Sequence, residues 1–329
     1  MKKIFFGKPI KKEILSFFQF RQRLKIIKNN IEFRNEFQSN DSSIDKLYSI
    51  DKTIIDETYK LIFNEYETII LYEINIEKNT EKKINFIGNF NIFNSEKTFI
   101  FINGKKTNFQ KNFLLNSGKK IILLCNNEKK TLTNLEKMFF KLDFITKIYF
   151  IKINTKNVKN MQKMFYSCKK LLFIDLKNLN TSNVTNMFNI FYNCCSLKHL
   201  NLSNFNTKNL INMKSMFSLC KNLISIEFSN DFNTNSVKKI ECLFLECSKL
   251  KIIKNFEKFV GNEIVDINGM FANCENLEIL DLRLFNFDKI ENLKEIFCGC
   301  EKLKKIIINK KYFNLFLNEV ENKNILICV

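Results

Sequence analysis

Residues 131–309 repeat one pattern of apolar positions. An anchor phenylalanine, preceded by an aliphatic residue or Met, recurs every 26 or 27 residues, and in six of seven units a cysteine follows it by three positions. An aliphatic residue then stands six positions after the anchor. The anchors are Phe139, Phe165, Phe191, Phe217, Phe244, Phe271 and Phe297. Chance does not hold such a phase over seven units, so the pattern predicts a repeat architecture.

Within each unit the spacing of apolar residues changes. Leu171-x-x-Ile174-x-Leu176 alternates with period two, which is typical of a short strand with one buried face. An Asn-Thr loop follows, and then Val184, Met187 and Phe191 show the three-to-four spacing of one helix face. No unit can bury its apolar side alone, so stacked units should pair their strands in parallel at about 4.8 Å per repeat.

These observations predict an α/β repeat fold, a leucine-rich-repeat solenoid of about seven units of 26–27 residues. Parallel strands would form its concave face, with short helices or turns on the convex face. The constant phase of the units assigns a structural core that recurs from unit to unit. The core residues expected from the four best units are Phe165, Cys168, Leu171, Phe191, Cys194, Leu197, Phe217, Cys220, Leu223, Phe271, Cys274 and Leu277.

The best unit runs from Val184 through Asn206-Thr207 and reads V-x-N-M-x-x-M-F-x-x-C-x-x-L-x-x-L-x-L-x-x-F-N-T in consensus. This unit resembles the BspA-like leucine-rich-repeat proteins, a family named for bacterial surface antigens and abundant in protists. The resemblance implies a protein that binds a partner, with adhesion at the cell surface as the role of bacterial members. Protist members often carry a β-rich segment before the repeats.

The flanking segments differ from the repeats. Residues 51–130 are predicted as a β-rich lead-in that caps the first repeat, and 310–329 as the C-terminal cap. Strand-like runs of the lead-in are Thr68–Ile76, Lys83–Phe90, Thr98–Asn103 and Lys119–Cys125, with a turn at Asn103-Gly104. Residues 1–50 should be helical. Lys12–Lys28 is amphipathic there, with an apolar stripe of Ile14, Phe17, Phe18, Leu24 and Ile27.

Three interpretations of that N-terminal helix stay open. It could be a plain cap, or a docking module similar to the short F-box-like lead of some intracellular protist repeat proteins. It could also lie on a membrane surface, because it is basic and amphipathic. Acidic residues such as Glu32, Glu36 and Asp41 follow it closely and count against the membrane interpretation.

The net charge of +19 is spread over the chain, with +9 in residues 1–130 and +10 in 131–329. Lys far outnumbers Arg, whereas base recognition leans on Arg, so nucleic acid is an unlikely partner. We expect no transmembrane segment, because no apolar run approaches 18 residues, and no signal peptide. Eleven cysteines, an odd number, suit a reducing compartment, and the expected location is the cytoplasm.

The repeated cysteines and the single histidine limit the kinds of catalytic or metal site that this sequence could form. Cysteine at a fixed core offset indicates packing, although a metal or redox ladder is the alternative. His199 is the only histidine, which removes most acid–base and Cys–His schemes. Since phosphate-binding, dinucleotide-binding and nucleophile-elbow motifs are also missing from the sequence, we expect no enzyme, no catalytic residues, no cofactor and no metal.

The outward positions of the predicted strands are the candidate binding residues, because their chemistry varies while the frame stays fixed. They are Phe173, Asp175, Lys177, His199, Asn201, Ser203, Ser225, Glu227, Ser229, Ile279, Asp281 and Arg283. The middle column is acidic, which favours a basic or polar protein partner. The expected function is a monomeric protein-interaction scaffold or adaptor. Surface adhesion with a secreted location is the first alternative, and nucleic-acid binding through bulk charge is the second.

Overall fold

A computed structural model describes residues 66–77, 82–93, 95–103, 105–110, 112–317, 319–320 and 323–329. The predicted helical segment at 1–50, including the amphipathic run Lys12–Lys28, lies outside these residues. So does the first part of the predicted lead-in, residues 51–65.

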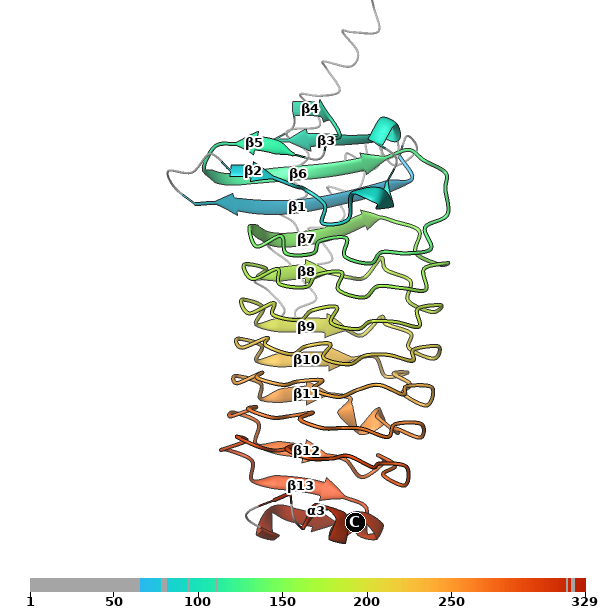
Figure 1. Ribbon diagram of the computed structural model, residues 1–329, viewed down its shortest axis with the longest axis vertical. Coiled ribbons are helices and arrows are strands. Elements are labelled where there is room, and N and C mark those ends of the chain that lie inside the picture. Colours follow the sequence, from blue (N-terminus) through green and yellow to red (C-terminus); the bar gives the residue numbers. More distant parts are fainter. Residues whose placement is uncertain are drawn as a thin grey trace, which may run out of the picture.

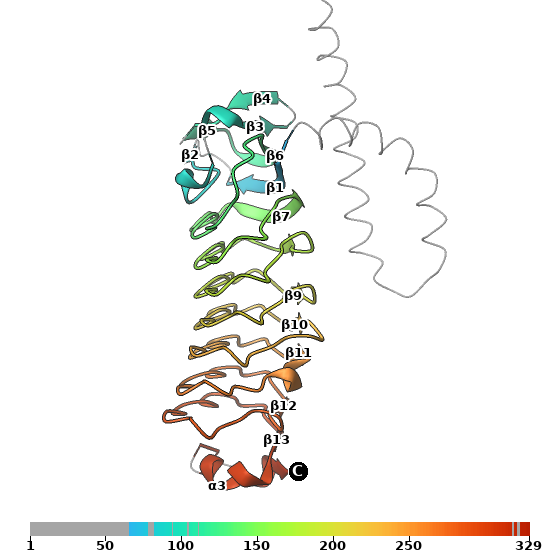
Figure 2. The same cartoon turned by 90° about the vertical axis from the view of Figure 1, so that its right-hand side faces the viewer.

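The repeats form a β-solenoid of about six turns, bounded by the seven anchor phenylalanines. Its coils stack as a straight column in two perpendicular views, without the curvature that a concave face requires (Figure 1, Figure 2). One side of the column carries the parallel strands, which pair in the ladders β7–β8, β9–β10–β11 and β12–β13. These strands are β7 (Ile145–Lys152), β8 (Phe173–Asp175), β9 (His199–Leu202), β10 (Ser225–Phe228), β11 (Ile252–Lys254), β12 (Ile279–Asp281) and β13 (Lys305–Ile308).

The segments opposite the strands, predicted as short helices or turns, are consecutive turns. Between coils, Met161 N–H donates to the Asn186 carbonyl at 2.9 Å, and Phe165 N–H donates to the Ile190 carbonyl at 2.9 Å. An α-helix would direct these N–H groups to carbonyls four residues earlier in the same segment. The turns still bring an apolar side chain inward every three or four residues, which is why their sequence imitates a helix face.

Left-handed backbone conformation at fixed places makes these turns possible. In every coil, the residues two positions before and two positions after the anchor phenylalanine have φ between 50° and 71°. A helix needs φ near −63° at each position, so it cannot form through them. These residues are Lys137, Lys141, Lys163, Ser167, Asn189, Asn193, Ser215, Leu219, Cys242, Glu246, Gly269, Asn273, Glu295 and Gly299.

The core is a ladder of parallel phenyl rings along the column axis. Successive anchor rings lie 5.2–6.2 Å apart between centroids, with interplanar angles of 8–20°. Every core residue named from the sequence is buried, none being more than 1% exposed. The ladder continues beyond the last coil, because Phe316 of the C-terminal cap lies 6.0 Å from the ring of Phe297.

Asn and Thr side chains join adjacent coils, which gives the abundance of Asn a structural reason. The Thr181 hydroxyl donates to the Asn206 carbonyl and accepts from the Asn206 N–H, both at 2.9 Å. Thr155 and Thr207 repeat this arrangement one coil away on either side. The amide of Asn204 donates to the Leu176 carbonyl at 3.0 Å in the preceding coil. Buried backbone groups of the loops are thereby satisfied without a sheet.

An antiparallel sheet covers the first coil. The strand β1 (Thr68–Ile76) pairs with β7, and the sheet order is β4-β3-β6-β1-β7-β8. Its other strands are β3 (Thr98–Ile102), β4 (Lys105–Asn108) and β6 (Gly118–Asn126). The strand β1 coincides with the predicted one, while Lys83–Phe90 is not a single strand. Most of the first half of that run belongs to β2 (Lys82–Ile84), which pairs with β5 (Phe113–Leu115). The run ends at the start of the 3-10 turn η1 (Phe90–Ile92). A second 3-10 turn, η2 (Ser95–Lys97), precedes β3.

The other end of the column is covered by short elements after β13. These are η4 (Lys310–Tyr312), α3 (Phe313–Phe316), η5 (Lys323–Ile325) and β14 (Leu326–Cys328), and β14 pairs in parallel with β13. The 3-10 turn η3 (Phe256–Lys258) lies earlier, where the repeats lose their Asn-Thr loop.

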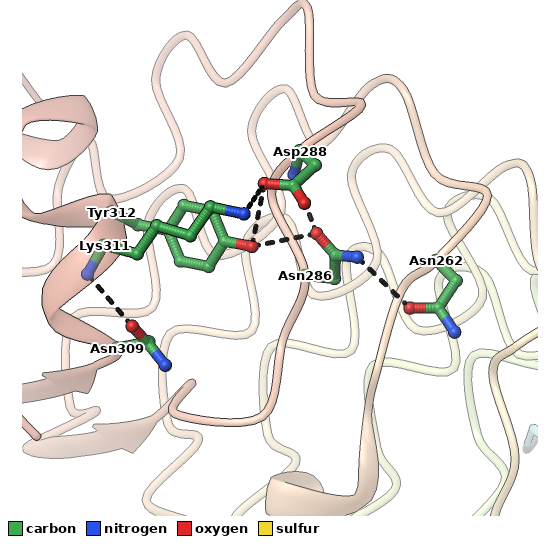
Figure 3. A network of polar contacts seen from close by, with 6 residues as sticks. All are labelled: Asn262, Asn286, Asp288, Asn309, Lys311 and Tyr312. Atoms are coloured by element: carbon green, nitrogen blue, oxygen red, sulfur yellow. Dashed lines mark hydrogen bonds and ion pairs between the residues drawn. The ribbon is translucent and has the colours of Figure 1, made fainter.

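A polar network fastens this cap to the preceding coil (Figure 3). The Tyr312 hydroxyl lies 2.9 Å from Asn286 Oδ1 and 3.1 Å from Asp288 Oδ1, and Lys311 forms an ion pair with Asp288. Asn286 in turn contacts Asn262, one coil earlier, at 3.4 Å. Its hydrogen bond with Lys311 lowers the pKa of the Asp288 carboxyl. The contacts of Tyr312 and Lys311 hold the cap on the last coils, and the Asn286–Asn262 contact joins two coils, so we assign the network a structural role.

Candidate interaction surface

The outward face of the parallel strands is the candidate surface, and its side chains form columns along the solenoid axis. In β9, His199 and Asn201 point to solvent while Leu200 and Leu202 are buried. The register places His199 beside Ser225 and Asn201 beside Glu227 in the next coil. Because the strand spacing is one coil, each column presents one side chain about every 4.8 Å.

The first column changes from buried to exposed along the axis. Near the N-terminal end, the half-buried Phe173 ring lies 5.4 Å from the ring of Tyr149. His199 Nδ1 lies 2.8 Å from the Ser225 hydroxyl in the middle of the face. Further along, at equivalent positions of consecutive coils, Ile252 is 51% exposed and Ile279 is 58% exposed. Two branched aliphatic side chains therefore stand open to solvent on this face.

The second column is not the acidic surface that the sequence suggests. Each of its carboxylates has a basic partner on the same face: Lys177 Nζ lies 3.0 Å from Asp175, and Lys254 Nζ lies 3.6 Å from Glu227.

Asp281 and Arg283 form the third such pair, with Arg283 Nε 2.9 Å from a carboxylate oxygen. The hydrogen bond from Arg283 lowers the pKa of the Asp281 carboxyl. All three acids are thus neutralised locally, and the face gives no preference for a basic partner.

Several predicted contact residues serve their own loops. Asp175 and Asp281 each accept a hydrogen bond from the backbone N–H two residues later, at 3.1 Å, and Asn201 does so at 2.8 Å. These bonds end the strands as Asx turns. The hydroxyl of Ser229 accepts from the Asp231 N–H at 3.1 Å, and Ser229 is only 8% exposed, so it is not available to a partner. Lys177, Ser203 and Arg283 are exposed just after their strands.

Sequence reasoning missed Ile252, which belongs to this face. Although Lys254 was placed in the outward column, neither outward residue of this strand was among the predicted contact residues, and the loop of this fifth unit departs from the Asn-Thr pattern. The strand nevertheless keeps the frame, with Leu250 buried and Ile253 packed against the core. Because successive strand residues point to opposite faces, Ile252 and Lys254 point outward. The alternation of the strand alone therefore identifies them as surface residues.

The repeated cysteines form a ladder of thiols inside the column. Each thiol donates to the carbonyl of the anchor phenylalanine one coil earlier, at 3.0–3.2 Å. The six residues are Cys168, Cys194, Cys220, Cys247, Cys274 and Cys300.

Burial controls the ionisation of this ladder. It raises the pKa of Cys168 and of Cys220 to about 12, and that of Cys300 to about 11. It raises the pKa of Cys194, Cys247 and Cys274 well above the usual range as well. Since the thiolate is the nucleophile and the metal ligand, these groups are chemically quiet at neutral pH.

Metal-binding clusters and membrane-spanning helices are both missing from the described residues. Within these residues, no group of three or more His, Cys, Asp or Glu side chains is placed to hold a metal ion. In the same part of the chain, no helix is both long and apolar enough to cross a membrane.

Comparison with protein families gives one result that covers most of the solenoid. A family model described as "Mycoplasma protein of unknown function, DUF285" matches residues 107–226, 133–259 and 224–315. The three matches overlap and together span 107–315, well over half of the chain, as expected when one model aligns with successive repeats. Comparisons with curated proteins and with solved structures give no significant match. The chain therefore belongs to the DUF285 family, in the form of a repeat β-solenoid.

Proposed function

We propose that this protein is a non-catalytic interaction scaffold that binds a protein partner on the outward strand face, around β11 and β12. The observation that carries the proposal is the exposure of Ile252 and Ile279 at equivalent positions of consecutive coils. Exposed apolar side chains surrounded by charged pairs are the usual composition of a protein-binding patch, with an apolar centre and a polar rim. Glu227–Lys254 and Asp281–Arg283 supply that rim.

The finer assignment to BspA-like leucine-rich repeats is part of this proposal. It rests on the L-x-x-L-x-L frame and on the binding role that the resemblance implies. A cytoplasmic location is also proposed, because eleven cysteines, an odd number, suit a reducing compartment. We further propose that the scaffold acts as a monomer.

Proximity labelling in the native cell tests the scaffold. The wild-type chain is compared with an Ile252→Asp/Ile279→Asp double variant and with a Val265→Asp control, which changes another exposed aliphatic residue, 44% exposed, off the strand face. We expect one set of cytosolic neighbours to disappear in the double variant and to persist in the control. Identical neighbours in all three would refute the strand face as the binding site, and secretory or surface neighbours would favour the adhesin alternative.

The salt dependence of binding distinguishes the nucleic-acid alternative from this proposal. Binding through bulk charge requires affinity for DNA or RNA that falls steeply as the salt concentration rises. The Ile252→Asp/Ile279→Asp change adds two negative charges to a net charge of +19, so it would weaken such binding only slightly, and the Val265→Asp control would weaken it in the same way.

A further inference from the structure

The coils of the column are joined by backbone contacts at several places around each coil. On one side the parallel strands pair with each other. In the turns, N–H groups donate to carbonyls of the next coil, as Phe165 does to Ile190. Before the turns, the residue five positions ahead of each anchor forms an isolated β-bridge with its equivalent in the next coil, and we call this place the bridge position. The bridges are Asn134–Asn160, Asn160–Asn186, Asn186–Asn212, Asn212–Lys239 and Asp266–Asn292.

The junction between the coils of β11 and β12 lacks both the strand pairing and the bridge. The strands are not paired, and no bridge joins Lys239 to Asp266. The N–H of Met213 donates to the Lys239 carbonyl at 2.9 Å, but the equivalent N–H of Ile240 has no such bond to Asp266. Strand pairing is also interrupted between β8 and β9, where the bridge Asn160–Asn186 is kept. Within the described repeats, only the β11–β12 junction loses both contacts.

The sequence gives a physical reason for this gap. Every other coil has Asn at the bridge position, whereas these two coils have Lys239 and Asp266. The side chain of Asn160 donates to Glu136 of the preceding coil at 3.3 Å. At the equivalent places of this junction stand Asp266, which has no N–H to donate, and Glu241, whose Oε2 has no hydrogen-bond partner. Two carboxylates thus replace a donor and an acceptor, which weakens the contact between the coils.

Two attachments remain at the junction. In the turns, the Phe244 N–H donates to the Met270 carbonyl at 2.8 Å, and the rings of Phe244 and Phe271 stack at 5.5 Å. In the loops, the Asn286 N–H donates to the Val260 carbonyl at 2.6 Å. Around one coil the order is bridge position, turns, strand and loop, so the missing contacts lie on opposite sides of the line that joins turns to loop. Two points of attachment define an axis of rotation.

We propose that the junction between β11 and β12 is a hinge, at which the C-terminal coils rock on the preceding ones about this axis. Movement in one direction separates β11 from β12 and opens the core between them to solvent. Ile252 and Ile279 lie on the two sides of the hinge, so its movement changes their spacing on the strand face. This effect on binding rests on the proposed function, whereas the hinge itself rests on the contacts between coils alone.

The buried thiols supply a reporter for separate junctions in the unmodified chain. The Cys274 thiol donates across the hinge to the Phe244 carbonyl at 3.2 Å, while Cys194 and Cys220 make the same bond across other junctions at 3.1 Å. All three are 0% exposed. The full chain is alkylated under native conditions, and mass spectrometry gives the rate at each thiol. We expect Cys274 to react faster than Cys194 and Cys220 by on the order of tenfold. Equal rates at the three thiols would overturn the proposal.

A repair variant separates the hinge from fraying of the last coils. Lys239→Asn/Asp266→Asn restores the residue of the other coils at the bridge position. We expect the rate at Cys274 to fall to that at Cys220, which should itself stay unchanged. Fast labelling of Cys274 that persists in the variant would show that the last coils open without the hinge, and would contradict the proposal.

The converse variant transfers the hinge to a joined junction. Asn186→Lys/Asn212→Asp places the same two residue types between the coils of β9 and β10, and should raise the rate at Cys220 by on the order of tenfold. An unchanged rate at Cys220 would contradict the bridge position as the origin of the hinge. None of these measurements requires a partner, so they fail or succeed separately from the proposed binding on the strand face.

Discussion

The solenoid column and the sheet that caps its first coil solve the same problem, burial of strands, in opposite ways. From β8 onward, the column uses strands of three or four residues that bury one face, and its coils are joined by similar contacts from one level to the next. The cap uses nine-residue strands, β1 and β6, paired along their whole length and apolar on both faces. Stability in the column thus comes from repetition, and in the cap from two-sided burial of long strands.

The backbone differs between the two regions as well. Each coil contains two left-handed residues within its turns. In the described part of the cap sheet, left-handed residues occur only at strand ends, at Asn103 and Gly118. The column therefore depends on local backbone conformations and internal hydrogen bonds that the cap does not need.

The largest expected difference concerns alkaline pH, which should unfold the column. The usual thiol pKa is 9.0, and burial raises it in the folded ladder, to about 12 for Cys168 and Cys220. The folded thiols therefore keep their protons while unfolded ones lose them, so stability that is complete below pH 9 is lost as pH rises toward 12. Five deeply buried thiols together remove on the order of 7 kcal/mol per pH unit. Denaturant midpoints measured between pH 7 and 11 check this.

A single-thiol variant separates this effect from general alkaline damage. Cys220→Ala should be less stable at pH 7, but its stability should fall less steeply above pH 9, by about 1.4 kcal/mol per pH unit. Parallel slopes for the variant and the wild type would show that the thiol ladder is not what titrates.

Removing one ring from the phenyl ladder should cost the next largest amount. Phe191→Ala leaves a cavity between Phe165 and Phe217, whose rings lie 5.2 and 6.0 Å away, and should lower the free energy of unfolding by about 3–5 kcal/mol. Phe188→Ala, in the same coil but half-exposed, should cost about 1 kcal/mol. Urea denaturation measures both.

Hydrogen exchange on the same variant tests whether the two regions behave separately. In a solenoid each coil contacts only its neighbours, so protection should fall in the coils next to Phe191 and persist in β1 and β6. An equal loss of protection in the cap sheet would mean that column and cap unfold as one unit.

The joints between coils give a third, smaller effect. Thr181→Val keeps the shape of the side chain but leaves the N–H and the carbonyl of Asn206 without their partner, at a cost of about 2–4 kcal/mol. The control is Thr185→Val. Its hydroxyl donates to the Lys159 carbonyl, which also accepts backbone N–H groups of Thr185 and Asn186, so less than about 1 kcal/mol should be lost. Equal thermal shifts for the two variants would contradict the proposed joint.

Features of the fold that depend on periodicity were predictable from the sequence. The phase of the anchors predicted the stacked rings, and the apolar run Thr68–Ile76 predicted β1 to the residue. The sequence did not decide between short helices and turns opposite the strands, because their apolar spacing is the same and because Lys163 and Ser167 are not residues that mark a left-handed conformation.

The candidate surface was predicted less completely than the fold. Ile252 was missed because the loop of its unit, unlike its strand, departs from the repeat pattern. The middle column was predicted to be acidic, but Glu227 pairs with Lys254 of the next coil. The spacing of residues along the sequence does not show such a contact between coils.

The smallest predicted effect is a gain in stability, whereas the other variants lose stability. Glu295 has φ of 57° and is exposed, so Glu295→Gly relieves a left-handed strain of about 1–2 kcal/mol against an entropy cost of about 0.5–1 kcal/mol. We expect a gain in stability of about 0.5–1 kcal/mol by calorimetry. Glu301, exposed in the same coil without a positive φ, should lose a similar amount on substitution by Gly. In a helix, glycine would cost about 1 kcal/mol at position 295 as well. Opposite signs for the two variants therefore support the chain of turns that sets the column apart from its cap, and equal losses would restore the helix that the sequence pattern suggested.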